Sequence, residues 1–239
     1  MHQKKAMRLV IILCLSLFPA LSTGIQSTFE LLIKRNEFPM FSYQQTTVTA
    51  GTHDECATQC ARNPRCSLFK YEIPASQCTT LAPDRFNWGS AEVRKAQESV
   101  YAHTDTGWCP VEQGYIFLRD IQTCIRVSST TANHDSALIQ CGQHGGRLII
   151  LSDSNKWEMI SKMTLDPLVT GLTVLVRVGA DDNTVSGTYV WGDGRPVNGS
   201  LWSSGEPNDP NEHCVAISNG ALYDIPCTMV VYFICEIHK

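Results

Sequence analysis

Ten cysteines downstream of residue 24 constrain the fold of this chain more than any other feature of its sequence. They form two groups, four between positions 56 and 78 and six between positions 109 and 235, while an eleventh, Cys14, lies in an apolar N-terminal segment. An even number of cysteines in an exported chain predicts disulfides, because such bonds persist in oxidising compartments. The alternative is a zinc site at Cys56 and Cys60, but no CxxC pair and no nearby pair of histidines accompanies them. We therefore expect five disulfides, formed by Cys56, Cys60, Cys66, Cys78, Cys109, Cys124, Cys141, Cys214, Cys227 and Cys235.

The N-terminal segment has the form of a secretory signal peptide. Lys4, Lys5 and Arg8 precede the apolar run 9–20, and small residues follow at 22–24. This order is typical of a leader that is removed after residue 22 or 24. The alternative is a membrane anchor, which needs about 20 apolar residues, whereas this run has 12. We expect residues 1–24 to be a signal peptide and the protein to be secreted, extracellular and without a membrane span.

Charge argues against one class of partner. Three of the 19 Lys and Arg residues and none of the 23 acidic residues lie in positions 1–24, so the mature chain carries a net charge of −7. A chain with this balance and no basic cluster lacks the electrostatic footprint of a nucleic-acid-binding protein. An acidic surface suits calcium better than phosphate.

The two cysteine groups predict two domains. Removal of 24 of the 239 residues leaves 215, a length that favours two domains over one. A short polar run at 103–107 precedes the second group and marks the expected boundary. We expect one domain at 25–105 and another at 107–239.

In the first domain, residues 52–62 are predicted to form a helix. Thr52 is an N-cap residue, Glu55 stands three residues further on as in a capping box, and Asn63-Pro64 ends the helix. The first two cysteines of the group then lie four residues apart on one helical face. Strands are predicted at 66–71 and 99–102. A core this small depends on its disulfides.

This half of the chain resembles the PAN/apple family. The residues that carry the resemblance are Glu55-Cys56-x3-Cys60-x5-Cys66-Ser-Leu-Phe-Lys-Tyr, Cys78-Thr-Thr-Leu and Ser99-Val-Tyr. The resemblance implies a small α+β domain with the pairs Cys56–Cys78 and Cys60–Cys66. It also implies contacts with protein or carbohydrate, and no catalytic residues. The outer cysteine pair of the longer apple form is absent from this chain.

Two helices are predicted in the second half. The first, at 132–144, places Ala137, Leu138 and Cys141 on a buried face and ends at a Gly-Gly pair. The second, at 153–163, turns Trp157, Ile160 and Met163 inward.

Short strands complete an α+β pattern. They are predicted at 147–151, 174–178, 188–191, 213–217 and 230–237. Between them lies a long segment, 192–211, rich in Gly, Pro, Asn and Ser. A loop of this length is uncommon unless it is functional or disordered.

The second half resembles a C-type lectin domain over nearly all of 107–239. The matching segments are Trp108-Cys-Pro, Ala137-x3-Cys141-x3-Gly145-Gly-Arg-Leu, Val190-Trp-Gly-Asp-Gly, Trp202-x3-Glu206-Pro-Asn, Glu212-His-Cys-Val, Asp224-Ile-Pro-Cys227 and Phe233-Ile-Cys235-Glu. The resemblance implies the C-type lectin fold: two helices, two small antiparallel sheets and a long loop region. It implies the pairs Cys141–Cys235, Cys214–Cys227 and, for the hairpin of the long form, Cys109–Cys124. The Cys109–Cys124 spacing is somewhat wider than the family usually shows.

The long loop carries the candidate binding site. Glu206, Asn208, Glu212 and Asp224 offer three carboxylates and an amide oxygen, the ligands that calcium prefers. In the family, the Glu-Pro-Asn triplet binds calcium and two neighbouring sugar hydroxyls, and this order goes with mannose-type sugars. The resemblance therefore implies a calcium-dependent mannose-type site at these residues, with a cis bond before Pro207.

One segment departs from the family pattern. Leu222-Tyr223-Asp224 stands where lectins with this triplet usually have Trp-Asn-Asp. Either Tyr223 replaces the ligand Asn, or it takes the place of Trp and the Asn is deleted; the short Cys214–Cys227 interval favours deletion. Both alternatives remove an amide that a phenol does not replace. We expect weakened calcium affinity, and Tyr223 is a candidate to lie against a sugar face.

Other polar and aromatic residues near the loop receive structural interpretations. His213 is predicted to be a strand residue and not a ligand. Asp181 and Asp182 suit either an auxiliary calcium site or an acidic turn. Trp191 and Trp202 are expected to be core and loop-anchoring residues.

These observations favour a binding protein over an enzyme. The leading hypothesis is a calcium-dependent lectin whose partners are glycans or glycoproteins; Asn198-Gly-Ser adds a glycosylation acceptor. The alternative is a calcium-independent adhesion or matrix protein that binds protein ligands through both domains. An enzyme is disfavoured, because all mature cysteines are expected to be paired and no catalytic motif is present.

Overall fold

The structure, a computed structural model, describes residues 9–11, 27–32, 41–86, 100–103, 108–165, 174–183 and 185–238. The chain divides into two compact units: Met1–Phe38, Tyr43–Pro83 and Ala91–Cys124 form the first, and Pro39–Ser42, Asp84–Ser90 and Ile125–Lys239 form the second. The predicted signal peptide lies outside the described residues except for positions 9–11, as does the predicted boundary except for His103. None of the described helices is both long and apolar enough to cross a membrane.

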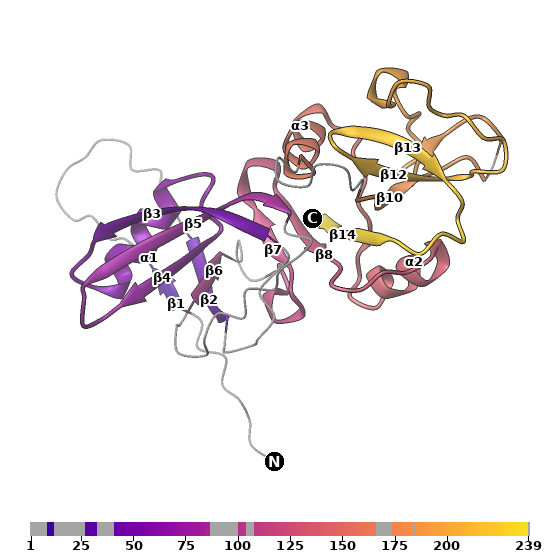
Figure 1. Cartoon of the computed structure of the whole chain (residues 1–239). Coiled ribbons are helices and arrows are strands. Elements are labelled where there is room, and N and C mark those ends of the chain that lie inside the picture. The colour runs from indigo at the N-terminus through magenta and orange to yellow at the C-terminus, as the bar shows by residue number, and fades with distance from the viewer. Residues whose placement is uncertain are drawn as a thin grey trace, which may run out of the picture. The chain divides into compact units, whose positions relative to one another are not determined.

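The first unit combines one helix with a six-stranded sheet (Figure 1). Its strand order is β1-β2-β6-β4-β5-β3, and the helix α1 lies against β4. The two predicted strands are confirmed as β4 and β6, each beginning slightly later than expected. The bounds are β1 (Leu9–Ile11), β2 (Ser27–Leu32), β3 (Phe41–Thr49), α1 (His53–Arg62), β4 (Leu68–Glu72), β5 (Gln77–Phe86) and β6 (Val100–His103).

Local hydrogen bonds set the ends of α1, as the sequence predicts. The Thr52 hydroxyl accepts from the Glu55 backbone N–H at 3.1 Å, which is the N-cap bond. The Glu55 carboxylate accepts from the Gly51 N–H at 2.6 Å, one residue before the donor that an ideal capping box uses. At the other end, Asn63 adopts an extended conformation and ends the helix.

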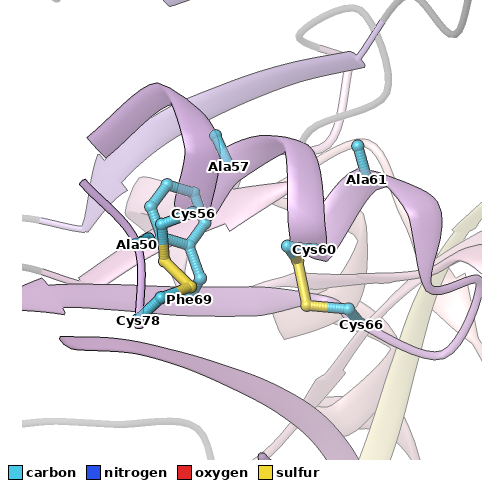
Figure 2. Close-up of a cluster of buried hydrophobic side chains, with 8 residues drawn as sticks. All are labelled: Ala50, Cys56, Ala57, Cys60, Ala61, Cys66, Phe69 and Cys78. Atoms are coloured by element: carbon cyan, nitrogen blue, oxygen red, sulfur yellow. A yellow bond between two sulfur atoms is a disulfide. The ribbon is translucent and has the colours of Figure 1, made fainter. Parts of the chain in front are cut away.

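The core of the first unit is small and built around sulfur. Figure 2 shows the side chains that it buries, among which Phe69 is the one large ring drawn. The disulfides Cys56–Cys78 and Cys60–Cys66 both form, as the resemblance implied. Ala57 and Ala61, which follow Cys56 and Cys60 in α1, are buried in the same cluster. The cluster consists of Ala50, Cys56, Ala57, Cys60, Ala61, Cys66, Phe69 and Cys78.

Residues 108–124 complete the first unit. They form η1 (Val111–Gln113), β7 (Ile116–Leu118) and η2 (Arg119–Ile121), and the Cys109–Cys124 disulfide joins their two ends. The Arg119 guanidinium donates to the carbonyls of Cys60, Ala61 and Asn63 at 3.2, 2.9 and 2.8 Å. These carbonyls lie at the C-terminal end of α1, where a helix has fewer internal donors than carbonyls, and the guanidinium adds to the backbone bonds that Cys60 and Asn63 already accept.

The second unit carries two helices on a sheet of short strands (Figure 1). The strand order is β13-β12-β10-β14-β8, with β11 paired to β10 and β9 paired to β14. The β10–β14 pairing is parallel and joins the antiparallel groups on either side of it. The bounds are β8 (Thr123–Val127), α2 (His134–Gly142), β9 (Arg147–Leu148), α3 (Ser154–Met163), β10 (Val176–Asp181), β11 (Val190–Trp191), η3 (Gly199–Leu201), β12 (Cys214–Ser218), β13 (Ala221–Ile225) and β14 (Tyr232–His238).

Both predicted helices are confirmed, with one error in the buried face of α2. Asn133 caps α2, and His134, Ala137 and Cys141 are its buried residues. Leu138, predicted to be buried, is 44% exposed, because it lies at the edge of the stripe that those three residues define.

The helix α3 is capped by Asp153, and its residues Ile160 and Met163 are buried as predicted. Trp157 is half-buried.

A buried ion cluster ties α3 to the sheet. Glu236 of β14 is fully buried, and its two carboxylate oxygens lie 2.6 Å from Lys156 Nζ and 2.9 Å from Arg147 Nε. Because each oxygen has its own cation, the buried carboxylate is compensated. The Cys141–Cys235 disulfide joins α2 to the same strand, one residue earlier.

Candidate functional site

The predicted ligand residues come from the long loop and from β13. Glu206, Asn208 and Glu212 lie in the loop that precedes β12, and Asp224 lies on β13 opposite Val215. The Cys214–Cys227 disulfide joins the start of β12 to the segment after β13. In Figure 1 the loop is drawn in orange at one end of the second unit, clear of α2.

Asp224 is the centre of the site. It is only 3% exposed, yet it is a carboxylate whose oxygens accept from the loop backbone. The Asn208 N–H lies 3.2 and 3.1 Å from its two oxygens, and the Asp209 N–H lies 3.3 Å from one of them. Such hydrogen bonds compensate the burial of a charge and hold the loop against β13.

Glu206 and Glu212 lie in the electrostatic field of Asp224. A hydrogen bond with Asp224, together with burial and the charges of Asp224 and Glu212, raises the pKa of Glu206 to about 7. Burial first, and then the charges of Asp224 and Asp209, raise the pKa of Glu212. Asn208 Nδ2 donates to Glu206 Oε2 at 2.8 Å. Three carboxylates, those of Glu206, Glu212 and Asp224, therefore influence one another, and the neutral amide of Asn208 lies against Glu206.

The donor set fits calcium in its chemistry. A cation would offset the negative charge of Asp224, which adds to the hydrogen bond and burial that raise the pKa of Glu206 and to the burial that raises the pKa of Glu212. Oxygen donors are the ligands that calcium takes. Within the part of the chain that the structure describes, however, no three acidic, His or Cys side chains converge as a metal-binding group. The Asp224 oxygens accept from backbone N–H groups instead.

Tyr189 joins this cluster, although the sequence analysis did not select it. Its hydroxyl donates to the Glu212 carbonyl oxygen and lies 3.4 Å from Asp224 Oδ2. Burial and then the charges of Asp224 and Asp182 raise the pKa of Tyr189, so the hydroxyl stays protonated and remains a donor. Tyr189 lies within the strand predicted at 188–191, and a lone tyrosine in a strand carries no signal in the sequence that would indicate this role.

Tyr223 is not brought to the carboxylates. Its hydroxyl accepts from the Ser203 hydroxyl at 3.1 Å. Its ring packs against the cluster of Cys214, Ala216 and Ile225. Successive side chains of a strand point to opposite faces, so Tyr223 and Asp224 point apart. The placement does not support the predicted contact between Tyr223 and a sugar.

The acidic pair before the loop forms a turn. Asp182 is 3% exposed and accepts from the Gly187 N–H at 2.5 Å, and its other oxygen lies 2.8 Å from His213 Nδ1. Asp181 accepts from the Asn183 N–H at 3.0 Å. These local bonds favour the acidic turn over an auxiliary calcium site. His213 contacts Asp182 immediately before β12 begins.

The remaining predicted residues occupy structural positions. Trp191 is 1% exposed, and the ring of Trp202 meets that of Tyr189 edge-on at 4.9 Å. Trp191 is therefore a core residue, and Trp202 packs on Tyr189 at the loop, in line with the expectation of core and loop-anchoring roles. The Glu206–Pro207 bond is cis, also as expected. Asn198 is exposed, caps η3 and accepts from the Ser200 backbone and hydroxyl at 3.0 Å.

Comparison with known families accounts for both halves of the chain. Residues 32–105 match the PAN domain, and residues 130–237 match the Lectin C-type domain. The chain carries a PAN domain followed by a C-type lectin domain. The two recognised resemblances and the α+β fold are thereby confirmed, and all five implied disulfides form in the structure.

Several curated proteins are similar to this chain. C-type lectin domain family 17, member A, of Homo sapiens is 26% identical over 235 residues, or 96% of this chain and 54% of that protein. C-type lectin domain family 4 member G of Mus musculus is 33% identical over 57% of this chain and 43% of its own length. Collectin-10 of Gallus gallus is 32% identical over 45% of this chain and 39% of its own length. The chain thus spans about half or less of the length of each relative.

Solved structures similar to this chain cover about half of it. The mouse scavenger receptor C-type lectin carbohydrate-recognition domain is 25% identical, with a TM-score of 0.43, over 49% of this chain and 89% of that chain. A calcium-independent type II antifreeze protein is 24% identical, with a TM-score of 0.41, over 49% and 87%. The curated relatives include members of C-type lectin domain families, in agreement with the prediction that the protein is not an enzyme.

Proposed function

We propose that the protein is a secreted, calcium-dependent lectin with a preference for mannose-type sugars. Glu206, Asn208, Glu212 and Asp224 would hold the ion, and Glu206 and Asn208 would face the sugar. The observation that carries the proposal is the clustering of Glu206, Asn208 and Glu212 around the buried carboxylate of Asp224.

The chemistry of the cluster suits sugar hydroxyls. A carboxylate such as that of Glu206 accepts the proton of a hydroxyl, while the amide NH2 of Asn208 donates to the hydroxyl oxygen. A calcium ion, when bound, supplies coordination of two neighbouring hydroxyls. The 2.8 Å bond between Asn208 and Glu206 already places an acceptor and a donor side by side. Tyr223 contributes no amide, so we propose that calcium is bound more weakly than in lectins with a full ligand set.

Retention on mannan tests the proposal. The full-length chain is expressed in cultured animal cells, and the secreted product is passed over mannan-agarose with calcium. We expect retention that EDTA reverses and that free galactose does not. The double variant Glu206→Gln with Asn208→Asp should lose retention, because both groups that face the sugar are changed.

The matched control makes the same two chemical changes elsewhere. Glu158→Gln with Asn155→Asp alters exposed residues of α3 and should leave retention unchanged. Flow-through of the unaltered protein in the presence of calcium would refute the mannose-type site.

Secretion and glycosylation belong to the same proposal. Asn198 is exposed and stands in an Asn-Gly-Ser acceptor sequence. N-terminal sequencing of the secreted product is expected to begin at residue 23 or 25. A glycosidase that removes N-linked glycans should lower its mass, and Asn198→Gln should abolish that change.

A second candidate is calcium-independent adhesion to a protein ligand. One observation favours it: the loop is held on Asp224 by its own N–H groups, which need no ion. A PAN domain in the same chain as the lectin domain adds a second contact surface, which strengthens binding through avidity. Binding to a protein partner that persists in EDTA would support this candidate over the first.

A further inference from the structure

The Tyr189 hydroxyl links two of the proposed ligand residues. Tyr189 stands immediately before β11, Glu212 lies in the loop before β12, and Asp224 lies on β13. The hydroxyl donates to the Glu212 carbonyl oxygen and lies 3.4 Å from Asp224 Oδ2. One phenolic proton thus faces two acceptors that lie on different segments of the chain.

The tyrosine ring is held in place by its surroundings. Tyr189 is 8% exposed, and its ring meets Trp202 edge-on with 4.9 Å between ring centroids. The Tyr189 backbone carbonyl accepts from the Val197 N–H at 3.0 Å. A side chain fixed on both sides presents its hydroxyl at a defined point, so it can orient the groups that it contacts.

The orientation of Asp224 matters to the whole loop. Its carboxylate accepts from the N–H groups of Asn208 and Asp209, which follow the cis-proline. A change in the angle of this carboxylate would therefore move both the backbone of the loop and one proposed metal ligand. The same hydroxyl also fixes the backbone carbonyl of Glu212. It therefore fixes the backbone from which the Glu212 side chain, a second proposed ligand, extends.

We propose that Tyr189 is a positioning residue for this site. It contacts neither ion nor sugar, and it acts by fixing the Glu212 backbone and the Asp224 carboxylate. The inference rests on the proposed function for its link to calcium, but its structural part, the ordering of Asp224, stands by itself. Two measurements test the link to calcium and the ordering of Asp224 separately.

The first measurement is calcium affinity, by isothermal titration of the full secreted chain. Tyr189→Phe removes the hydroxyl and keeps the ring against Trp202. Loss of a residue that orients metal ligands weakens metal binding by about tenfold or more, and we expect a loss of about that size. Tyr71→Phe removes a phenol hydroxyl from the PAN domain and should leave the affinity unchanged.

The second measurement needs no calcium. In the calcium-free protein, Tyr189→Phe should speed hydrogen exchange of the Asn208 and Asp209 amides about three- to tenfold, as the loss of one hydrogen bond would. The Gly179 amide, which donates to the Ile149 carbonyl in the core, should exchange as before and shows that the variant is folded.

The outcomes are distinct. Faster exchange with weaker calcium binding supports the inference as a whole. Faster exchange in a protein that binds no calcium refutes the proposed function and leaves the ordering of Asp224 established. Unchanged exchange at Asn208 and Asp209 overturns the inference, whatever the calcium affinity.

Discussion

At the scale of single residues, the second unit buries two basic side chains, Arg177 and His134, near each other. Arg177 on β10 is fully buried, and its Nη2 donates to the Met229 carbonyl at 2.8 Å. Burial lowers its pKa to about 10. His134, at the start of α2, is 7% exposed, and burial followed by the charge of Arg177 lowers its pKa. The folded lectin unit therefore resists protonation of His134.

This resistance predicts a loss of stability in acid. An unfolded chain protonates histidine near pH 6.5, whereas the folded protein protonates His134 only at a lower pH. The contribution of His134 to the free energy of unfolding is thus fully present above about pH 6.5 and falls as the pH drops toward the folded pKa. Urea unfolding at pH 7.5 and pH 5 should show a smaller decrease for His134→Gln than for the unaltered protein.

An exposed histidine is the control for this measurement. His238→Gln changes a residue at the end of β14 that is exposed to solvent. Its unfolding free energy should change with pH as that of the unaltered protein does. If the free energy of unfolding of the His134 variant changed with pH as much as that of the unaltered protein, His134 would not contribute to the loss of stability in acid.

Residue identity could predict much of the site, but not all of it. Glu206, Asn208, Glu212 and Asp224 carry the oxygen donors and follow the pattern of a known family, so the sequence identified them. Tyr189 has no such signature, because its role depends on which atoms its hydroxyl contacts in the folded protein.

At the scale of elements, the helix ends follow local rules. Thr52, Asn133 and Asp153 cap α1, α2 and α3 through bonds to N–H groups two or three residues ahead. The sequence predicted the cap at Thr52, whereas Asn133 and Asp153 were expected within the helices 132–144 and 153–163. The C-terminal end of α1 differs, because its carbonyls accept hydrogen bonds from the guanidinium of Arg119. This residue lies 59 positions after Cys60 in the sequence.

The N-cap of α1 gives a testable prediction. Thr52→Ala removes the side-chain oxygen that accepts from the Glu55 N–H. The free energy of unfolding of α1, followed by hydrogen exchange of its amides, should fall by about 1 kcal/mol. Thr58→Ala is the matched control: its hydroxyl bonds the Asp54 carbonyl within the helix, and alanine favours a helix interior. This control should cost nothing, and an equal loss in both variants would contradict the cap.

Among the elements, the strands were predicted least well from the sequence. β13 was not predicted, although it forms five residue pairs with β12 and carries Asp224. Its segment includes Ala221 and Leu222 and lacks the clear alternation of a half-buried strand. Pairing with β12 stabilises it, because the Asn219-Gly220 turn brings the two strands together with positive φ at both turn residues.

At the scale of the whole molecule, five disulfides cross-link the chain over very different distances. Cys141–Cys235 closes 94 residues, from α2 to the last strand, whereas Cys214–Cys227 closes 13. A disulfide stabilises chiefly by restricting the unfolded chain, so the longer closure has the larger effect.

This difference in loop length predicts which of the two disulfides contributes more to the free energy of unfolding. Replacing both cysteines of Cys141–Cys235 by serine should lower the free energy of unfolding by about 5 kcal/mol, and the same change at Cys214–Cys227 by about 3 kcal/mol. Urea denaturation of the two double variants under oxidising conditions measures both. A larger loss from the short loop would show that native-state packing outweighs chain entropy here.

The sequence by itself determined the features that depend on neighbours along the chain or on a recurring motif. These include the cysteine framework, the three helices with the N-cap of α1, the two families and the four oxygen-bearing residues of the candidate site. The boundary between the domains at 103–107 remains a prediction, as do the calcium ligands.

Tertiary structure decided which side chains meet. It placed Tyr223 against the cluster of Cys214, Ala216 and Ile225, left Leu138 exposed, and brought Tyr189 to Glu212 and Asp224. The physical reason is common to all three. The neighbours of a side chain depend on the register of paired strands and on the rotation of a helix against its sheet, and both are set by contacts between segments far apart in the chain.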